Sequence, residues 1–402
     1  MDPLRFVLIA FALLQACAPS GADTLAFWDR PQRGANSFNG RPPDEPYFRA
    51  LRSYGATWVR LAFDKWPTAR RDFLLGDADA YDRLDGDDLK VLVAALHRAH
   101  AAGLKVVVTP LSLPGARSRQ RHGNEYDDRI WTDKAYWDQS ARFWRDLAVE
   151  LKDHPAVAGY NLINEPAPER RGGLPESAAP DAMQAWYDAQ RGGTRDLFAL
   201  YESVIAAIRK VDAHTPIMLD SGFHGSPSAY RHLPAPVRDA AVLYAYHMYE
   251  PWTATSARNL RREKPYAYPG VVPDRGVESH WDAARLARVL RYPVDWAREH
   301  GVAPNRLVAA EFGCMRRWES CPRYLDDVLT VLEEDAVHWA FYAFREDVWD
   351  GMDYELGVAR VPWQYWDAVE AGEDFPLERR PNPVFEPITR RLRGAAFAEE
   401  TQ

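Results

Sequence analysis

The chain has 402 residues, of which 47% are hydrophobic and 27% are charged, and its formal net charge at pH 7 is −8. This balance is typical of a globular protein with a large core, and it argues against a disordered chain, a collagen and a polytopic membrane protein. The negative charge also argues against a nucleic-acid partner, because phosphate binding requires a basic surface.

The first predicted element is an export signal. Arg5 precedes an apolar run, Phe6 to Ala16, which has the proportions of a signal-peptide core and is too short to span a bilayer. The run ends in Leu14-Gln15-Ala16-Cys17, which resembles the bacterial lipoprotein box, where the cysteine becomes the acylated first residue. We therefore expect Cys17 to be the site of lipid attachment.

This interpretation divides the N-terminal region into two parts. Residues 1–16 are expected to be a lipoprotein-type signal peptide, and residues 17–30 a tether that holds the protein to a membrane surface in the cell envelope. The alternative is an ordinary secretory signal cleaved near Ala22, which would leave a soluble secreted or periplasmic protein.

The rest of the chain alternates between short apolar runs and longer helical stretches. The nearly continuous apolar runs are typical of parallel strands covered on both faces. The predicted strands are Gly34–Phe38, Thr57–Phe63, Leu104–Leu111, Val157–Asn164, Pro216–Ser221, Ala241–Tyr249, Arg306–Phe312 and His338–Phe344. The predicted helices are Pro46–Tyr54, Asp87–Ala102, Lys134–Lys152, Arg195–Val211, a short one near Pro234–Asp239, His280–His300, Pro322–Glu334 and Asn382–Arg393.

Eight strands that alternate with helices predict an α/β protein with a single closed (β/α)8 TIM barrel, which we place over residues 31–395. An open doubly wound sheet is the alternative fold, but the segment from Gly34 to Gly40 lacks the glycine-rich phosphate-binding fingerprint that such a sheet would carry. Long insertions follow the C-terminal ends of strands, where a barrel carries its chemistry. They span Arg117–Arg129, Ala167–Gly193, Trp252–Glu278 and Glu346–Pro381.

Two glutamates stand at the C-terminal ends of apolar strands. Glu165 follows the fourth strand in Asn164-Glu165-Pro166, and Glu311 ends the seventh in Ala310-Glu311-Phe312-Gly313. A charged group next to such runs is costly unless it has a role. Strands four and seven lie nearly opposite in a barrel, so both side chains can face one cleft. Two opposed carboxylates are what cleavage of a glycosidic bond requires.

These segments resemble the motifs of a known family. Asn164-Glu165-Pro166 is similar to the acid/base motif of glycoside hydrolase family 5, a family of cellulase-like clan A barrels, and the Glu311 segment is similar to its nucleophile motif. Arg60 matches the arginine of the family's second strand. The resemblance extends over residues 34–360.

Further positions match the family in the predicted order. His247 and Tyr249 correspond to its strand-six pair, and Trp339 on strand eight is similar in place to its sugar-stacking tryptophan. The resemblance implies that His247 bonds in the cleft, and that Trp339, together with Trp252, offers an apolar face to a pyranose. Asn164 is expected to bond the sugar 2-hydroxyl.

The resemblance implies a retaining β-glycosidase that works by double displacement. Glu311 would attack the anomeric carbon, and Glu165 would protonate the leaving oxygen and then activate water. We expect Arg60 and the Tyr249 hydroxyl to favour the anion of Glu311, and Glu165 to hold its proton longer. Asp220, at the end of strand five, is expected to anchor a loop. No cofactor and no metal are expected, because a metal-dependent barrel would require a His-x-His on strand one, where residues 37–39 contain no histidine.

The expected substrate is a β-1,4-linked polysaccharide or oligosaccharide, with endo action on β-glucan first. Family cellulases often carry a histidine at the end of strand three, which is absent from Thr109 to Gly115. Endo-β-mannanase activity, or another β-glucosidic substrate, is therefore the alternative within the class. A non-catalytic carbohydrate-binding surface lipoprotein is the alternative from another class, but a binding protein would need neither glutamate.

Two further features remain from the sequence. Cys314 and Cys321 are expected to form a disulfide in an exported chain, with two buried thiols as the alternative. The acidic stretch Asp77–Asp88 and the arginine-rich segment Arg117–Arg121 are expected to be solvated, with the binding of acidic sugars as a weaker interpretation of the arginines.

Overall fold

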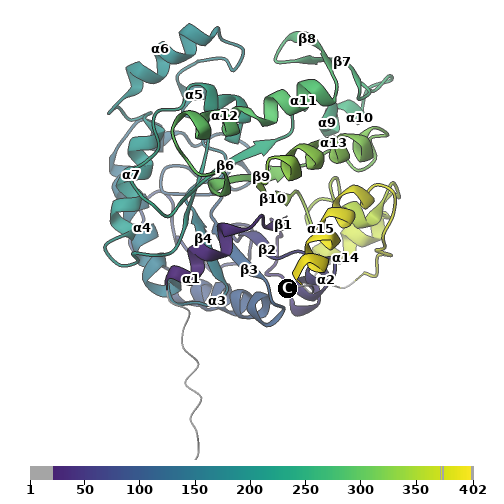
Figure 1. Cartoon of the computed structure of the whole chain (residues 1–402). Coiled ribbons are helices and arrows are strands. Elements are labelled where there is room, and N and C mark those ends of the chain that lie inside the picture. The colour runs from purple at the N-terminus through teal and green to yellow at the C-terminus, as the bar shows by residue number, and fades with distance from the viewer. Residues whose placement is uncertain (1–20, 372, 374, 400–402) are drawn as a thin grey trace, which may run out of the picture.

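The computed structural model describes residues 21–371, 373 and 375–399, and it confirms the predicted (β/α)8 barrel. Eight parallel strands close on themselves in the order β1-β10-β9-β6-β5-β4-β3-β2, and helices surround them (Figure 1). The predicted signal peptide and Cys17 lie outside the described residues. Within the described part, no helix is long and apolar enough to span a bilayer.

Each barrel strand overlaps one of the eight predicted strands. The strands are β1 (Arg33–Ser37), β2 (Trp58–Ala62), β3 (Lys105–Thr109), β4 (Val157–Asn161), β5 (Ile217–Asp220), β6 (Val242–Met248), β9 (Leu307–Phe312) and β10 (His338–Phe341). Closure comes from β1, which pairs in parallel with both β2 and β10. All eight C-terminal ends therefore meet at one rim, and the loops that follow them share one side of the molecule.

The predicted helices are also present, with two corrections. The helices at predicted positions are α2 (Glu45–Ser53), α3 (Gly86–Ala101), α4 (Ala135–Leu151), α7 (Leu197–Ile208), α11 (Ala283–Leu290), α12 (Tyr292–Glu299), α13 (Cys321–Glu334) and α15 (Glu386–Glu399). The single helix expected over His280–His300 is divided into α11 and α12, because Pro293 lacks an amide hydrogen and begins a new helix. The helix expected near Pro234–Asp239 is absent, and a 3-10 turn at Pro227–Arg231 takes its place in this connection.

The insertions contain secondary structure that the sequence did not indicate. Their elements are α5 (Pro168–Arg171), α6 (Pro180–Gln190), α9 (Trp252–Thr255), α10 (Ala257–Leu260), β7 (Gly270–Asp274), β8 (Val277–Trp281) and α14 (Trp363–Ala371). A further short element, α8 (Gly222–Gly225), follows β5. β7 and β8 form an antiparallel hairpin above the barrel (Figure 1). Its turn residues, Arg275 and Gly276, both have positive φ, as the tight turns of hairpins require.

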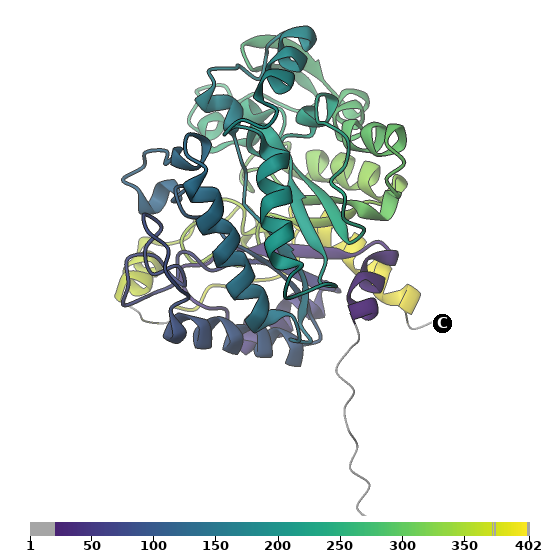
Figure 2. The ribbon, with the colours of Figure 1, turned by 90° about the vertical axis from the view of Figure 1, so that its left-hand side faces the viewer.

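A short N-terminal segment packs on the base of the barrel. It comprises α1 (Gly21–Ala26) and the 3-10 turn Phe27–Asp29, and Figure 2 shows it at the end of the strands. The fully buried Trp28 donates a hydrogen bond of 2.9 Å from Nε1 to the carbonyl oxygen of Ala158 and packs edge-on against Trp58. Part of the segment expected as a tether over residues 17–30 is thus folded against the barrel, and the domain begins before residue 31.

Candidate active site

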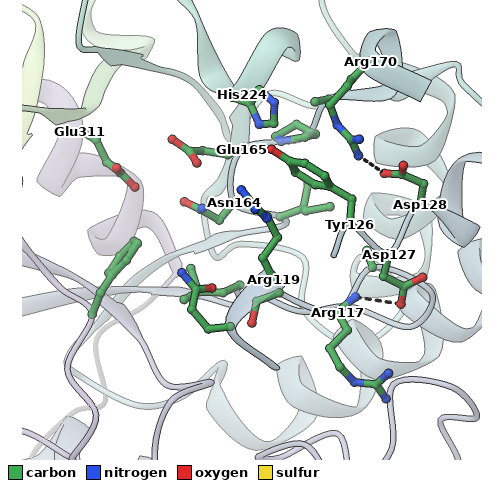
Figure 3. Close-up of a pocket in the computed structure, with 18 of the residues that line it drawn as sticks. Arg117, Arg119, Tyr126, Asp127, Asp128, Asn164, Glu165, Arg170, His224 and Glu311 are labelled. Atoms are coloured by element: carbon green, nitrogen blue, oxygen red, sulfur yellow. Dashed lines mark hydrogen bonds and ion pairs between the residues drawn. The ribbon is translucent and has the colours of Figure 1, made fainter. Parts of the chain in front are cut away.

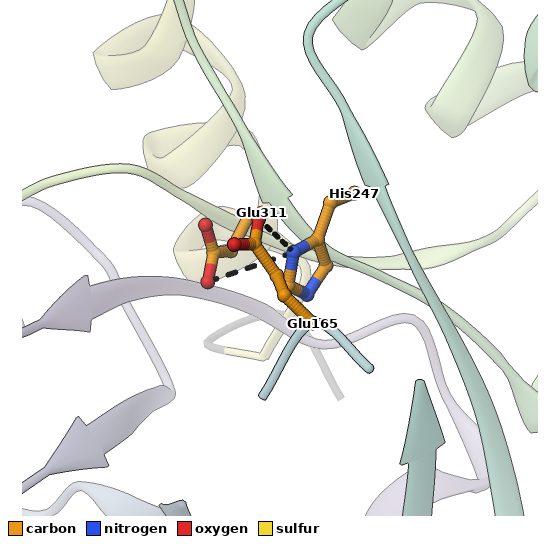
Figure 4. Close-up of side chains that lie close together, drawn as sticks. All are labelled: Glu165, His247 and Glu311. Atoms are coloured by element: carbon orange, nitrogen blue, oxygen red, sulfur yellow. Dashed lines mark hydrogen bonds and ion pairs between the residues drawn. The ribbon is translucent and has the colours of Figure 1, made fainter. Parts of the chain in front are cut away.

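The structure brings the two glutamates and His247 together at the C-terminal rim (Figure 4). A carboxylate oxygen of Glu165, one of Glu311 and a ring nitrogen of His247 all lie within 4.8 Å of one another. Glu165 follows β4 with a positive φ of 51°, and its amide donates a hydrogen bond of 3.1 Å to Asp220 Oδ2. This turn directs the Glu165 carboxyl, 35% exposed, into the cleft, whereas Glu311 in β9 is buried.

Arg60 on β2 organises the floor of the site. Its guanidinium, which is completely buried, donates from Nη1 to Glu311 Oε1 at 2.5 Å and from Nη2 to Asn164 Oδ1 at 2.7 Å. It also donates from Nε to Asn161 Oδ1 at 2.8 Å and from Nη1 to Asn36 Oδ1 at 3.2 Å. Sequence reasoning identified Arg60, Asn164 and Glu311 but missed Asn36 and Asn161. The available signal was that both asparagines lie in predicted strands that run to the same rim.

His247 and Tyr249 complete the contacts of the two carboxylates. The Tyr249 hydroxyl donates to Glu311 Oε2 at 2.8 Å. His247 Nδ1 lies 3.1 Å from Glu165 Oε1 and 3.7 Å from Glu311 Oε1, and Nε2 lies 3.2 Å from Asp220 Oδ2. The imidazole therefore contacts three carboxylates, and the predicted strand-six pair lies where the family resemblance placed it.

These contacts determine the protonation of the site. Burial alone would lower the pKa of His247, but the charges of Glu311 and Asp220 raise that pKa to about 10, so the ring is an imidazolium at neutral pH. Burial raises the pKa of Glu311 above its ordinary value, despite the charges of His247 and Arg60. Burial also opposes the anion of Glu165, but the hydrogen bond and charge of His247 outweigh it and lower the pKa of Glu165. In the free site these directions are opposite to those expected from the sequence.

Asp220, at the end of β5, holds the site in place from below. Its carboxylate accepts from the Glu165 amide and, at 2.9 Å, from Asn161 Nδ2, and it lies 3.4 Å from Arg60 Nη2. Burial would raise the pKa of Asp220, but the charges of His247 and Arg60 hold it at about 2. The expected role of Asp220 as an anchor is consistent with these contacts.

The glutamates open into a cavity of about 530 Å³ (Figure 3). Its lining includes Asn164, Tyr249 and Trp252. Trp252 is 53% exposed and packs edge-on against Tyr249, with ring centroids 6.0 Å apart. Trp252 therefore lies beside the cleft, as expected. The free face of its ring can stack on a sugar ring.

The assignment of Trp339 to the cleft is wrong. Trp339 is completely buried on the outer side of β10, where Nε1 donates to Glu333 Oε1 at 2.9 Å and the ring packs on Phe312. Side chains alternate along a strand, and the neighbouring Ala340 faces the barrel interior, so Trp339 must face the helices. After this strand, the aromatic side chains of Tyr342 and Trp349 line the cavity.

Arg117 is not solvated as expected, whereas much of the acidic stretch is, with the side chains of Asp82 and Asp87 88% and 91% exposed. The Arg117 side chain is buried and donates to Asp72 from Nε at 2.9 Å and from Nη2 at 2.8 Å. It further donates to Asp77 and Asp79, each at 3.1 Å. Arg117 therefore connects the insertion after β3 to the loop after β2. The complementary charges of the two segments were the signal in the sequence.

The spacing of Glu165, His247 and Glu311 would also suit a metal ion, but the chemistry of the three groups does not. A metal ligand must be deprotonated, whereas His247 keeps its proton up to about pH 10. Arg60 already occupies Glu311 with a charged hydrogen bond. Arg60 and the His247 imidazolium thus already place two positive charges beside the carboxylates, and a metal ion would have to compete with both.

A disulfide fixes the segment that follows the buried glutamate. Cys314 lies just beyond the end of β9, and Cys321 begins α13. Their sulfurs are bonded at 2.08 Å, in agreement with the expected pairing. The bond closes the loop between strand and helix directly behind the site.

Comparisons with known proteins agree with this geometry. The family model described as "Cellulase (glycosyl hydrolase family 5)" matches residues 20–347. A curated relative, a "Beta-xylosidase" from Phanerodontia chrysosporium, is 25% identical over 265 residues, which cover 62% of this chain and 47% of that protein. The chain thus spans about half the length of the curated relative that it matches.

Solved structures share the fold. An endoglucanase, Cel5A, from Thermotoga maritima has a TM-score of 0.60 at 16% identity and covers 92% of this chain and 100% of its own. The endoglucanase Cel5A of Pseudomonas stutzeri has a TM-score of 0.54 at 18% identity and covers 78% of this chain and 89% of its own. The barrel, the paired glutamates and the match of the family model over most of the chain lead to one conclusion: this chain belongs to glycosyl hydrolase family 5.

Proposed function

We propose that the protein is a retaining β-glycosidase in which Glu311 is the nucleophile and Glu165 the acid/base. The observation that carries the proposal is the approach of the two carboxyl groups, which have oxygens within 4.8 Å of each other. Retaining enzymes separate these groups by about 5–5.5 Å, whereas inverting enzymes need about 6.5–9.5 Å to admit a water molecule. Double displacement therefore fits the observed spacing better than inversion.

The contacts of the two glutamates support this division of roles. Glu311 is buried and held by Arg60 and Tyr249, so its oxygens are fixed for attack on an anomeric carbon. Glu165 is half-buried and open to the cavity, where a leaving oxygen can reach it. Catalysis requires the proton on Glu165 and the charge on Glu311. We infer that a substrate oxygen replaces His247 as the partner of Glu165, and that the imidazolium then stabilises the Glu311 anion beside it.

The substrate is proposed to be β-1,4-linked, with endo action on β-glucan first and β-mannan as the alternative. Structures of Thermotoga maritima Cel5A are described in complex with cellobiose and with mannotriose, and the curated relative is called a β-xylosidase. The open cavity with Trp252 at its edge suits a sugar chain. Another β-glucoside remains the third choice.

The test is a product analysis on β-glucans, β-mannans and β-xylans, with proton NMR of the first anomer released. Release of the β-anomer from one polymer, with internal chain cleavage, supports the proposal. Release of the α-anomer would refute retention. Tight binding of the polymers without any hydrolysis would instead favour the non-catalytic carbohydrate-binding lipoprotein.

We also propose that the protein is exported and attached to a membrane surface through acylated Cys17. The described chain begins at Gly21 near the base of the barrel, where Trp28 bonds to Ala158 at the start of β4. Glu165 follows the opposite end of the same strand. An anchor at Cys17 would therefore leave the cleft facing away from the membrane.

A further inference from the structure

The active-site cavity continues beyond Glu165 into a part that the catalytic contacts do not use. This part is walled by Arg119, Tyr126, Arg170 and His224 (Figure 3). An acid/base group stands beside the leaving oxygen, so the leaving portion of the substrate must extend to the Glu165 side of the cleft. We propose that this part of the cavity binds an anionic group on the leaving portion, a carboxylate or a phosphate, and that Arg119 is the residue that selects it. The inference rests on the proposed glycosidase function.

Arg119 is held in place by neighbouring groups and forms no ion pair with a described carboxylate. Its Nε donates to the carbonyl oxygen of Asn124 at 3.0 Å, and its guanidinium lies 4.6 Å from the ring centroid of Tyr126. Figure 3 shows the side chain reaching toward Asn164 and Glu165. Among the described residues, no carboxylate forms an ion pair with Arg119. An exposed guanidinium held over a ring in a cleft is a ready donor for a carboxylate or phosphate.

The aspartates of this region are already paired with other arginines. Asp127 pairs with Arg129 at 2.8 Å, and Asp128 pairs with Arg170. Asp72, Asp77 and Asp79, which lie behind the cavity, are bound by the buried Arg117. None of these five aspartates pairs with Arg119, so its guanidinium stays available to a ligand.

The opposite wall is held in a strained backbone. Phe223 and His224 both have positive φ, 50° and 60°, which is costly for residues with side chains. The Phe223 amide donates to Glu169 Oε2 at 3.1 Å, and the His224 amide donates to the carbonyl oxygen of Pro166 at 3.1 Å. Strain of this kind persists where surrounding contacts enforce it. Here the strained backbone directs the exposed His224 ring toward the cavity, and its centroid lies 6.2 Å from that of the Tyr126 ring.

The cleft also offers room for a longer leaving portion. A second cavity of about 460 Å³ shares Tyr126, Asp127 and Asp128 with the first. Its lining includes Arg171, which has no ion pair with a described residue, and His122. The Tyr126 ring borders both cavities, and the guanidinium carbon of Arg170 lies 3.3 Å from its centroid. A chain of acidic sugars would thus meet a second arginine beyond the first.

The experiment compares disaccharides of the preferred sugar that differ only at C6 of the reducing-end unit: a neutral alcohol, a carboxylate and a 6-phosphate. The wild-type protein is expected to show about tenfold higher kcat/KM for an anionic substrate than for the neutral one, mainly through KM, since a charged hydrogen bond is gained. The anionic substrate that the protein prefers shows whether the leaving portion of the natural substrate carries a carboxylate or a phosphate. Arg119→Gln should reduce the preference to less than threefold, and Arg119→Lys should retain part of it.

Arg83→Gln is the matched control, because the Arg83 side chain is 81% exposed and does not line either cavity. It should keep the full preference. Equal kcat/KM for the neutral and anionic substrates, or a preference that survives in Arg119→Gln, would overturn the inference. Turnover of an activated aryl glycoside separates the two proposals: turnover without any anion preference refutes only the anionic subsite, and no turnover of any glycoside refutes both.

Discussion

The imidazole of His247 lies 3.2 Å from the buried carboxylate of Asp220, and each group fixes the charge of the other. The pKa of His247 is raised to about 10 and that of Asp220 is lowered to about 2. Both groups are therefore charged between about pH 3 and pH 9, where a salt bridge beneath Glu165 can persist.

The pH dependence of stability should show this pair. A lowered carboxyl pKa contributes stability that is present above the unfolded value near 4 and is lost as pH falls through about 2. A raised histidine pKa contributes stability that is present below the unfolded value near 6.5 and is lost as pH rises through about 10. We expect Asp220→Asn to reduce the acid-dependent slope of the free energy of unfolding, measured by denaturant titration from pH 2 to 5.

NMR provides the direct measurement of His247. Its ring resonances should not titrate between pH 5 and 8. Titration of His247 near pH 6.5 would contradict the charge assignment. In Asp220→Asn the His247 pKa should fall, because one of its three carboxylate neighbours has lost its charge.

The two glutamates make distinct predictions for kinetics. Glu311→Gln preserves the shape of the side chain but removes the nucleophile, so hydrolysis of an activated aryl glycoside should fall by several orders of magnitude while circular dichroism stays unchanged. Near-normal rates would contradict the assignment.

Glu165→Ala removes the acid/base and admits a small anion. Sodium azide should partly restore turnover of the same aryl glycoside and yield the β-glycosyl azide, because azide attacks the glycosyl-enzyme without needing a base. Glu311→Gln should show no such β-product. Formation of the α-azide by Glu165→Ala would point to inversion.

The sequence was sufficient for the barrel and for the centre of the site because both depend on strand order. Arg60 and Glu311 lie in strands and Glu165 follows one, and parallel closure carries all three to one rim. The walls could not be predicted in the same way. Arg117 and Arg119 are two residues apart, yet Arg117 is buried by aspartates of a distant loop and Arg119 lies in the cavity. The difference between the two side chains arises from the packing of the insertion after β3 against the loop after β2, which the sequence does not reveal.

Trp339 illustrates the other limit of sequence reasoning, because one position along a strand reverses the face of a side chain. We expect Trp339→Phe to lower the melting temperature with unchanged KM and kcat, since the ring packs between β10 and the helices. Trp339→Ala should cost about 3–5 kcal/mol of stability. In contrast, Trp349→Ala should raise KM for oligosaccharides with little effect on the melting temperature, because Trp349 is 36% exposed and lines the cavity. If Trp339→Phe instead raised KM without changing the melting temperature, Trp339 would have to be assigned to the substrate cleft after all.

The disulfide should contribute to stability rather than to chemistry. It closes a short loop, with a sequence separation of 7, and loops of this size lose about 2–3 kcal/mol of stability when the cross-link is removed. The double variant Cys314→Ser and Cys321→Ser should therefore unfold at lower denaturant concentration, with kcat/KM on an aryl glycoside within about twofold of wild type when assayed well below the melting temperature. A large loss of kcat in a still-folded variant would mean that the loop positions Glu311.

The lipid anchor predicts where the protein is found in the cell. Wild-type protein expressed with its own N-terminal region in a bacterial host should sediment with membranes, dissolve in detergent and carry the mass of acyl chains on Cys17, since each buried methylene contributes about 0.8 kcal/mol. Cys17→Ser should move it to the soluble fraction, whereas the Cys314→Ser and Cys321→Ser variant, which keeps Cys17, should remain on the membrane. If Cys17→Ser stays membrane-bound, or if the mature wild-type mass begins after Ala22, acylation is wrong and the protein is exported by an ordinary secretory signal.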